Sequence, residues 1–118
     1  MNANANMKAN AKRGPLTGIK VLDLSSVIMG PVAAQHLADM GADVIKVEAP
    51  QGDLTRSIGP RKSGDMGAVF LNCNRNKRSI VLDMKQPKAR DVLYRLVAGS
   101  DVLIHSIRTA PAARIGLS

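Results

Sequence analysis

The chain has 118 residues, enough for one hydrophobic core and too few for two, so we expect a single domain or part of a larger one. Hydrophobic residues make up 45% of the chain, but it has one Phe, one Tyr and no Trp, so aliphatic side chains and Met must fill the interior. The formal net charge of +8 attracts anions, yet the scarcity of aromatic side chains and the dispersed basic residues argue against nucleic acid as the partner.

Residues 1–17 are rich in Asn and Ala and show no hydrophobic periodicity, which predicts a disordered, low-complexity tail. From residue 18 onward, strand and helix signals alternate. The run "GIKVLDLSS" predicts a buried strand, and "GPVAAQHLADMG" predicts a helix with Pro31 in its first turn and Gly41 as a left-handed cap. A second strand, "ADVIKVEAP", ends at Pro50. This βαβ unit requires parallel strands and a right-handed crossover.

The Gly-rich residues 51–67 predict a long surface loop, and "AVFLNCN" predicts one or two helical turns after it. A third strand, "RSIVLDM", and a helix over "QPKARDVLYRLVAGS" follow, with Pro87 at the helix start and Gly99 at its end. A fourth strand, "DVLIHS", precedes a last helix signal, "APAARIGLS". The pattern predicts the α/β class: a Rossmann-like open parallel sheet with flanking helices, incomplete because no strand follows the last helix.

Ligands of such sheets bind beyond the carboxyl ends of the strands, so the segments after each strand are candidates for a site. Glu48 ends the second strand where a dinucleotide-binding fold keeps its ribose-binding acid, but the glycine fingerprint is incomplete. A strand-end acid paired with Lys or Arg is an equal alternative. Asp23 and Asp83, placed inside strands, fit site carboxylates or, more commonly, hydrogen-bonded structural acids.

The sequence contains no recognisable metal or catalytic constellation. His36 and His105 are far apart and lack carboxylates at ligand spacing, and the single cysteine, Cys73, has no nearby histidine. One cysteine cannot form an intramolecular disulfide, which favours a reducing, cytoplasmic compartment. No apolar run reaches membrane-spanning length, and the first residues lack the apolar centre of a secretory signal, so no membrane partner is expected.

Three ordered segments identify a family resemblance: "PLTGIKVLDLSSVIMGPVAAQHLADMGADVIKVEAPQGD", "NRNKRSIVLDMK" and "DVLIHSIRTAPAARIGL". Together they resemble the N-terminal segment of the family III CoA-transferases, which include formyl-CoA and carnitine CoA-transferases and alpha-methylacyl-CoA racemase. The resemblance implies that residues 18–118 are the first part of a large CoA-binding Rossmann-like domain. It also implies interlocked homodimers of longer chains, with an acyl-CoA and a carboxylic acid as substrates and no tightly bound cofactor.

The resemblance carries CoA contacts onto the turn after the first strand, the end of the third strand and the exit of the fourth: Val27, Ile28, Met29, Leu82, Lys85 and Ser106. Charge alone adds phosphate contacts at the basic cluster before the third strand: Arg75, Lys77 and Arg78. Solvated surface cations are the alternative for these three. Arg108 retains the arginine of the family's "ENFRPG" motif, which reads "HSIRTA" here, so the packing expected around adenine does not carry over directly.

The family's catalytic groups lie downstream of the matched segment, so no residue of this chain is assigned a catalytic role. These groups are the nucleophilic aspartate of the transferases and the His/Asp pair of the racemases. Three functions remain open: a transferase whose segment here binds CoA, a non-catalytic remnant or CoA-binding module, and an acyl-CoA racemase.

Overall fold

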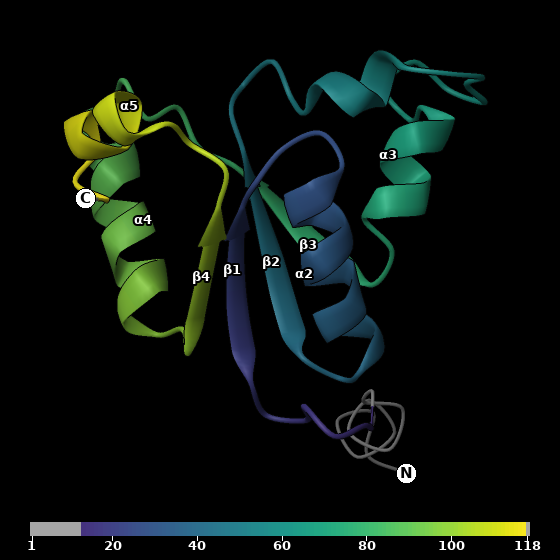
Figure 1. Cartoon of the computed structure of the whole chain (residues 1–118). Coiled ribbons are helices and arrows are strands. Elements are labelled where there is room, and N and C mark those ends of the chain that lie inside the picture. Colours follow the sequence, from purple (N-terminus) through teal and green to yellow (C-terminus); the bar gives the residue numbers. More distant parts are fainter. Residues whose placement is uncertain (1–12, 118) are drawn as a thin grey trace, which may run out of the picture.

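Four parallel strands form the sheet of the computed structural model, which describes residues 13–117. The strands lie in the order β3-β2-β1-β4, and every neighbouring pair is parallel, as Figure 1 shows. Their bounds are Lys20–Leu24 for β1, Asp43–Glu48 for β2, Lys77–Val81 for β3 and Val102–His105 for β4. The predicted α/β class with an open parallel sheet is confirmed.

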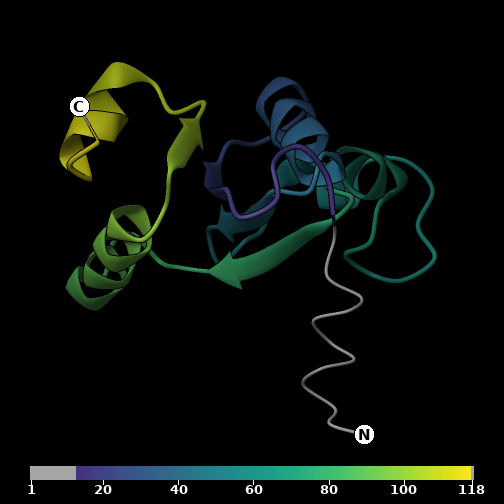
Figure 2. The same ribbon diagram turned by 90° about the horizontal axis from the view of Figure 1, so that it is seen from below.

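Helices lie between the strands along the chain, one more follows β4, and together they cover both faces of the sheet. They are α2 at Met29–Asp39, the 3-10 helix η1 at Leu54–Ser57, α3 at Ala68–Cys73, α4 at Pro87–Ala98 and α5 at Thr109–Arg114. Helices α2 and α4 lie on opposite faces of the sheet (Figure 2). None of the described helices is long and apolar enough to cross a membrane, and residues 13–117 contain no group of His, Cys, Asp and Glu side chains arranged to hold a metal ion.

Alternation along the strands divides the core into two clusters. On β1, Val21 packs with Ala34 and Ala38 of α2, whereas its neighbour Leu22 packs with Leu93 of α4. Successive side chains of a strand point to opposite faces, so a sheet covered on both sides needs consecutive apolar residues. In the strand sequence "KVLDL", Val21 and Leu22 meet that requirement. The next residue, Asp23, is instead a charged side chain that is fully buried on the α2 face.

The structure corrects two predicted boundaries. Of the predicted tail, residues 1–12 lie outside the described range, but residues 13–17 form a turn instead of disordered chain, because Leu16 packs against the α2-side cluster and its N–H donates to Met40 O. Strand β3 ends at Val81, so Asp83 follows the strand and does not lie within it. Gly41, with φ of +102°, adopts the predicted left-handed conformation after α2.

Candidate functional site

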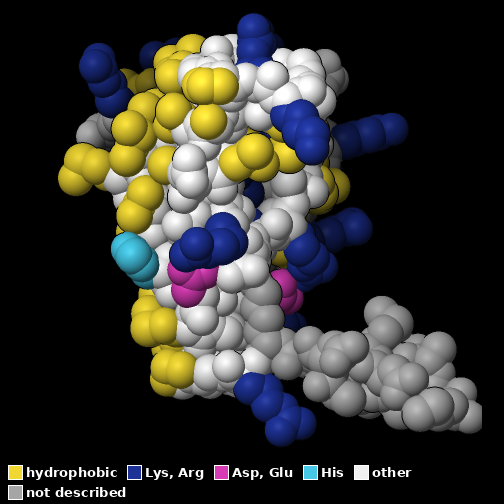
Figure 3. Space-filling view, turned by 90° about the vertical axis from the view of Figure 1, so that its right-hand side faces the viewer, with side chains coloured by type: hydrophobic (Ala, Val, Ile, Leu, Met, Phe, Trp, Pro, Cys, Tyr) yellow, Lys and Arg dark blue, Asp and Glu magenta, His cyan; other side chains and the backbone are white. Residues whose placement is uncertain are grey.

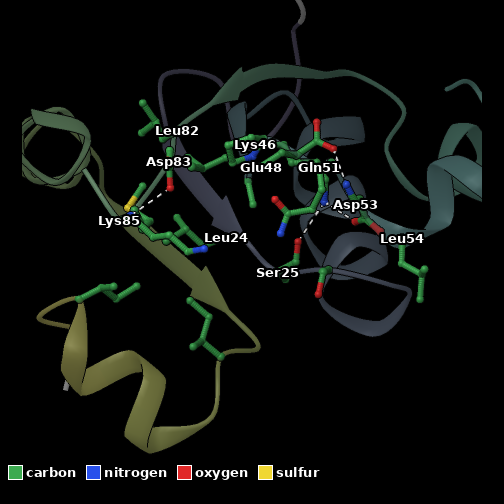
Figure 4. A pocket seen from close by; sticks show the side chains of 18 residues that line it. Leu24, Ser25, Lys46, Glu48, Gln51, Asp53, Leu54, Leu82, Asp83 and Lys85 are labelled. Carbon is green, nitrogen blue, oxygen red and sulfur yellow. Dashed lines mark hydrogen bonds and ion pairs between the residues drawn. The ribbon is translucent and has the colours of Figure 1, made fainter. Parts of the chain in front are cut away.

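A pocket of about 640 Å³ lies at the carboxyl ends of the strands, where this fold class binds its ligands (Figure 4). The ends of β1, β2 and β3 form its floor, and the loop after β2 and the segment around α5 form its walls. One part of the lining is apolar: Leu24, Val47, Leu82, Met84, Ile107 and Ile115. The other part is polar: Ser25, Ser26, Lys46, Glu48, Gln51, Asp53, Asp83 and Lys85.

Lys85 provides the pocket's unpaired cation. Its side chain extends into the pocket in Figure 4, and its backbone N–H donates to Asp83 Oδ1 at 3.1 Å, which fixes the turn after β3. No carboxylate among residues 13–117 forms an ion pair with the Lys85 ammonium, whereas Lys46, at the back of the pocket, is paired with Asp53 at 2.9 Å. Lys85 is therefore the pocket cation available to an anionic ligand.

The turn between β1 and α2 borders the pocket through Ser26. The three predicted CoA-contacting residues of this turn, Val27, Ile28 and Met29, are exposed, and Met29 is 88% exposed. Val27 has a φ of +73°, which is unfavourable for a β-branched residue and is held by its surroundings. Ser106, predicted from the exit of β4, lies against this turn, because its Oγ accepts from Ser26 N at 3.2 Å.

The other predicted residues are distributed unevenly. Leu82 and Lys85 line the pocket, and Arg108 is an exposed residue that directly precedes α5 and does not line it. Arg75 and Arg78 lie at the amino-terminal end of β3, away from the pocket, where they pair with Asp39 and Asp43. On the face that Figure 3 shows, Lys and Arg side chains are dispersed and form no single stripe.

Lys77 has a structural role that the sequence reasoning did not predict. Its ammonium donates to Asp23 Oδ2 at 2.8 Å, Pro31 O at 2.7 Å and Asn74 Oδ1 at 2.8 Å, and its side chain is only 2% exposed. Burial is the main cause that lowers the pKa of Lys77 from its ordinary value, and Asp23 opposes that shift. All three N–H groups are used, so the predicted phosphate contact of Lys77 is corrected to a buried ion pair.

A buried polar network, also missed from the sequence, occupies the α2 face at the carboxyl half of the sheet. Lys46 and Glu48 of β2 point to the same face as Val44, and both are nearly inaccessible to solvent. The Lys46 ammonium donates to Ser25 O at 2.9 Å and pairs with Asp53 Oδ2. The signal available in the sequence was the two-residue spacing of Lys46 and Glu48 within an apolar strand.

Glu48 anchors the loop after β2, which confirms the alternative of a strand-end acid paired with a basic residue. Its two carboxylate oxygens accept from Arg56 Nε at 2.8 Å and Arg56 Nη2 at 2.7 Å. Ser79 Oγ and the backbone N–H of Asp53 also donate to it. The Arg56 guanidinium in turn lies 3.7 Å over the ring of Phe70, so one buried carboxylate fixes η1 and α3 against the sheet.

We expect Glu48→Gln to reduce the dependence of stability on acid pH. Burial opposes ionisation of Glu48, but the hydrogen bonds from Arg56, Ser79 and Asp53 N lower its pKa from 4.5 to about 2. A carboxyl whose pKa is lower in the folded state stabilises the fold above pH 4.5, and that stabilisation is lost as the pH falls towards 2. The loss is on the order of 3 kcal/mol.

Urea unfolding of the wild type and Glu48→Gln at pH 6, 4 and 3 checks this expectation. The wild type should lose stability more steeply over this range, while a control variant, Asp91→Asn on the exposed side of α4, should follow the wild type. Parallel curves for the wild type and Glu48→Gln would contradict the assignment of Glu48 as an acid-sensitive anchor.

Comparison with known proteins places this arrangement in a family. The sequence pattern of CoA-transferase family III matches residues 16–118. A succinate–glutarate CoA-transferase of Agrobacterium fabrum is 46% identical over 113 residues, covering 90% of this chain and 28% of that protein. The human succinyl-CoA:glutarate CoA-transferase is 42% identical over 104 residues, covering 87% of this chain and 24% of that protein.

The solved structures agree with the sequence comparisons. The crystal structure of a CAIB/BAIF family protein from Brucella suis superimposes with a TM-score of 0.85 at 41% identity, covering 91% of this chain and 29% of that one. The chain thus spans about a quarter of the length of the curated relatives that it matches. Because the family pattern extends over nearly the whole described fold, the chain belongs to CoA-transferase family III.

Proposed function

We propose that this chain forms the CoA-binding segment of a CoA-transferase that moves CoA between an acyl-CoA and a carboxylic acid. The observation that carries the proposal is the pocket at the carboxyl edge, into which the Lys85 ammonium projects without a carboxylate partner among the described residues. Relatives named for succinate, glutarate and oxalate support a carboxylate as the CoA acceptor. CoA enters as a substrate and not as a tightly bound cofactor.

The two parts of the pocket lining match the chemistry of CoA. The phosphate groups of CoA are anionic and form charge-assisted hydrogen bonds with a lysine ammonium, which Lys85 supplies. The apolar part, with Leu82 and Ile107, offers a surface for the uncharged groups of the ligand. No residue of this chain is proposed to act as the nucleophile. The protein is further proposed to form a homodimer, as the family resemblance implies, and to be located in the cytoplasm, as its composition implies.

An NMR titration of the isotope-labelled 118-residue chain with CoA tests where the ligand binds. The proposal predicts shifts of the amide resonances at 26–29, 82–85 and 106–108, three segments that each contain residues of the pocket lining. Resonances of Asp43 and Arg78, at the opposite end of the sheet, serve as the internal control and should not move. Shifts concentrated around Arg75 and Arg78 instead would contradict the proposed site.

A further inference from the structure

Asp53 connects three segments at the edge of the pocket. Its Oδ1 accepts from the backbone N–H of Thr55 at 3.0 Å and from the Thr55 hydroxyl at 2.8 Å, which caps the start of η1. The same oxygen accepts from the backbone N–H of Val27, in the turn between β1 and α2, at 3.4 Å. Oδ2 has no aligned hydrogen-bond donor among the described residues, and its charge is met by Lys46 at 2.9 Å. One carboxylate thus joins η1, the turn and β2.

The β1–α2 turn depends on contacts from outside itself. Val27 occupies the left-handed region of backbone space, where a β-branched side chain is unfavourable and persists only when its surroundings hold it. Two consecutive N–H groups of the turn bond to side chains from distant segments: Ser26 N to Ser106 Oγ on one side and Val27 N to Asp53 Oδ1 on the other. The position of the turn is therefore set from both sides.

The charge of Asp53 is balanced where a polyanion is expected to bind. A free carboxylate in the lining would repel a phosphate group, but the buried pair with Lys46, in which both side chains are 1% exposed, neutralises it. Burial opposes ionisation of Asp53, and the hydrogen bonds from Thr55 together with the charge of Lys46 nevertheless hold its pKa below the ordinary value. Asp53 is thus a carboxylate whose available role is to accept hydrogen bonds from the chain itself.

We infer that Asp53 is a positioning residue, whose Oδ1 holds the turn of residues 26–29 in the conformation that receives CoA. It acts through the Val27 backbone N–H and not through contact with the ligand. The inference rests on the proposed function, because the turn affects binding only if CoA enters this pocket. It predicts that removal of the acceptor oxygen weakens CoA binding, whereas removal of the charge alone does not.

The test compares variants that share a neutral partner, because replacing Asp53 alone would leave Lys46 as an unpaired buried cation and threaten the fold. In a Lys46→Met background, Asp53→Asn retains an acceptor oxygen and is an equally good cap, whereas Asp53→Ala removes the acceptor. Lys46→Met/Asp53→Asn should bind CoA within about threefold of the wild type, and Lys46→Met/Asp53→Ala should bind at least about tenfold more weakly than Lys46→Met/Asp53→Asn. Asp43→Asn, at the exposed start of β2, is the control and should bind CoA as the wild type does.

Hydrogen exchange at the Val27 amide gives a readout independent of the ligand. The amide should exchange faster in Lys46→Met/Asp53→Ala than in Lys46→Met/Asp53→Asn, because only the asparagine retains its acceptor. Equal exchange in the two variants would show that Asp53 does not hold the turn, and equal CoA affinities despite different exchange would show that the turn's position does not govern binding. A folded wild-type chain that binds no CoA would refute the proposed function, while Val27 exchange would still decide whether Asp53 holds the turn.

Discussion

Lys77→Met is expected to destabilise the fold by about 3–5 kcal/mol, because it leaves a buried carboxylate without its cation. Asp23 is fully buried at the centre of the sheet, and the Lys77 ammonium is the charge that compensates it at 2.8 Å. The substitution also removes the donors to Pro31 O and Asn74 Oδ1. The apolar methionine fills a similar volume, so the effect reports the lost charge and hydrogen bonds more than a cavity. Equilibrium urea unfolding at pH 7 measures it.

The neighbouring residue provides a matched control. Arg78 follows Lys77 on β3 but points to the other face and pairs with Asp43 at 2.7 Å, with both side chains at least half exposed. An exposed pair of this kind contributes about 0–1 kcal/mol, so Arg78→Met should change the free energy of unfolding little. If the two variants had equal stability, Lys77 would not be the internal counter-ion of Asp23, and its assignment as a structural residue would be wrong.

Lys85→Ala is expected to weaken CoA binding by about tenfold to a hundredfold, the value of one charge-assisted hydrogen bond. Lys85 projects into the pocket and forms no ion pair among the described residues, so its removal should cost little stability. The binding constant should also depend less on salt in the variant than in the wild type, because one cation facing the ligand is gone. Titration calorimetry at two salt concentrations measures both effects.

Lys88→Ala is the matched control for this prediction. Lys88 lies three residues further on, in the first turn of α4, is exposed and does not line the pocket. Its removal lowers the net charge by the same amount, so any general attraction of the basic chain for CoA changes equally. Equal weakening by the two variants would mean that CoA responds to net charge and that Lys85 has no specific contact.

The sequence was sufficient to predict the sheet, because each of its elements carries a local signal. Apolar strand segments that alternate with helix segments along the chain, such as the periodic helix over residues 87–98, indicate the α/β class. Because parallel strands all run in the same direction, the pocket is expected beyond their carboxyl ends, where it is found. Leu82 and Lys85 were found in this way together with the family resemblance. The boundary at residue 17 was wrong because Leu16, flanked by Pro15 and Thr17, belongs to no periodic apolar run, and its burial becomes evident only once α2 is in place.

The polar side of the site could not be predicted, because it depends on pairs that are distant in the chain. Lys77 appeared as one of several cations before a strand, and nothing local distinguishes it from Arg78, yet the pleat turns Lys77 towards Asp23, 54 positions away. Lys46 and Asp53 likewise meet only after the loop folds back over β2. Charged residues inside an apolar strand were the available signal, and their partners required the three-dimensional fold.

Calorimetric titration of the folded 118-residue chain with CoA, repeated with 3′-dephospho-CoA, tests most directly whether this segment binds CoA. A circular dichroism spectrum with both helix and strand signals first establishes that the chain is folded. We predict saturable binding with one site per chain, weakened when the 3′-phosphate is absent and when salt is raised, because phosphate charge contributes to affinity. No saturable binding by the folded chain, or equal affinity for the two ligands at both salt concentrations, would contradict a CoA site built around the cation of Lys85.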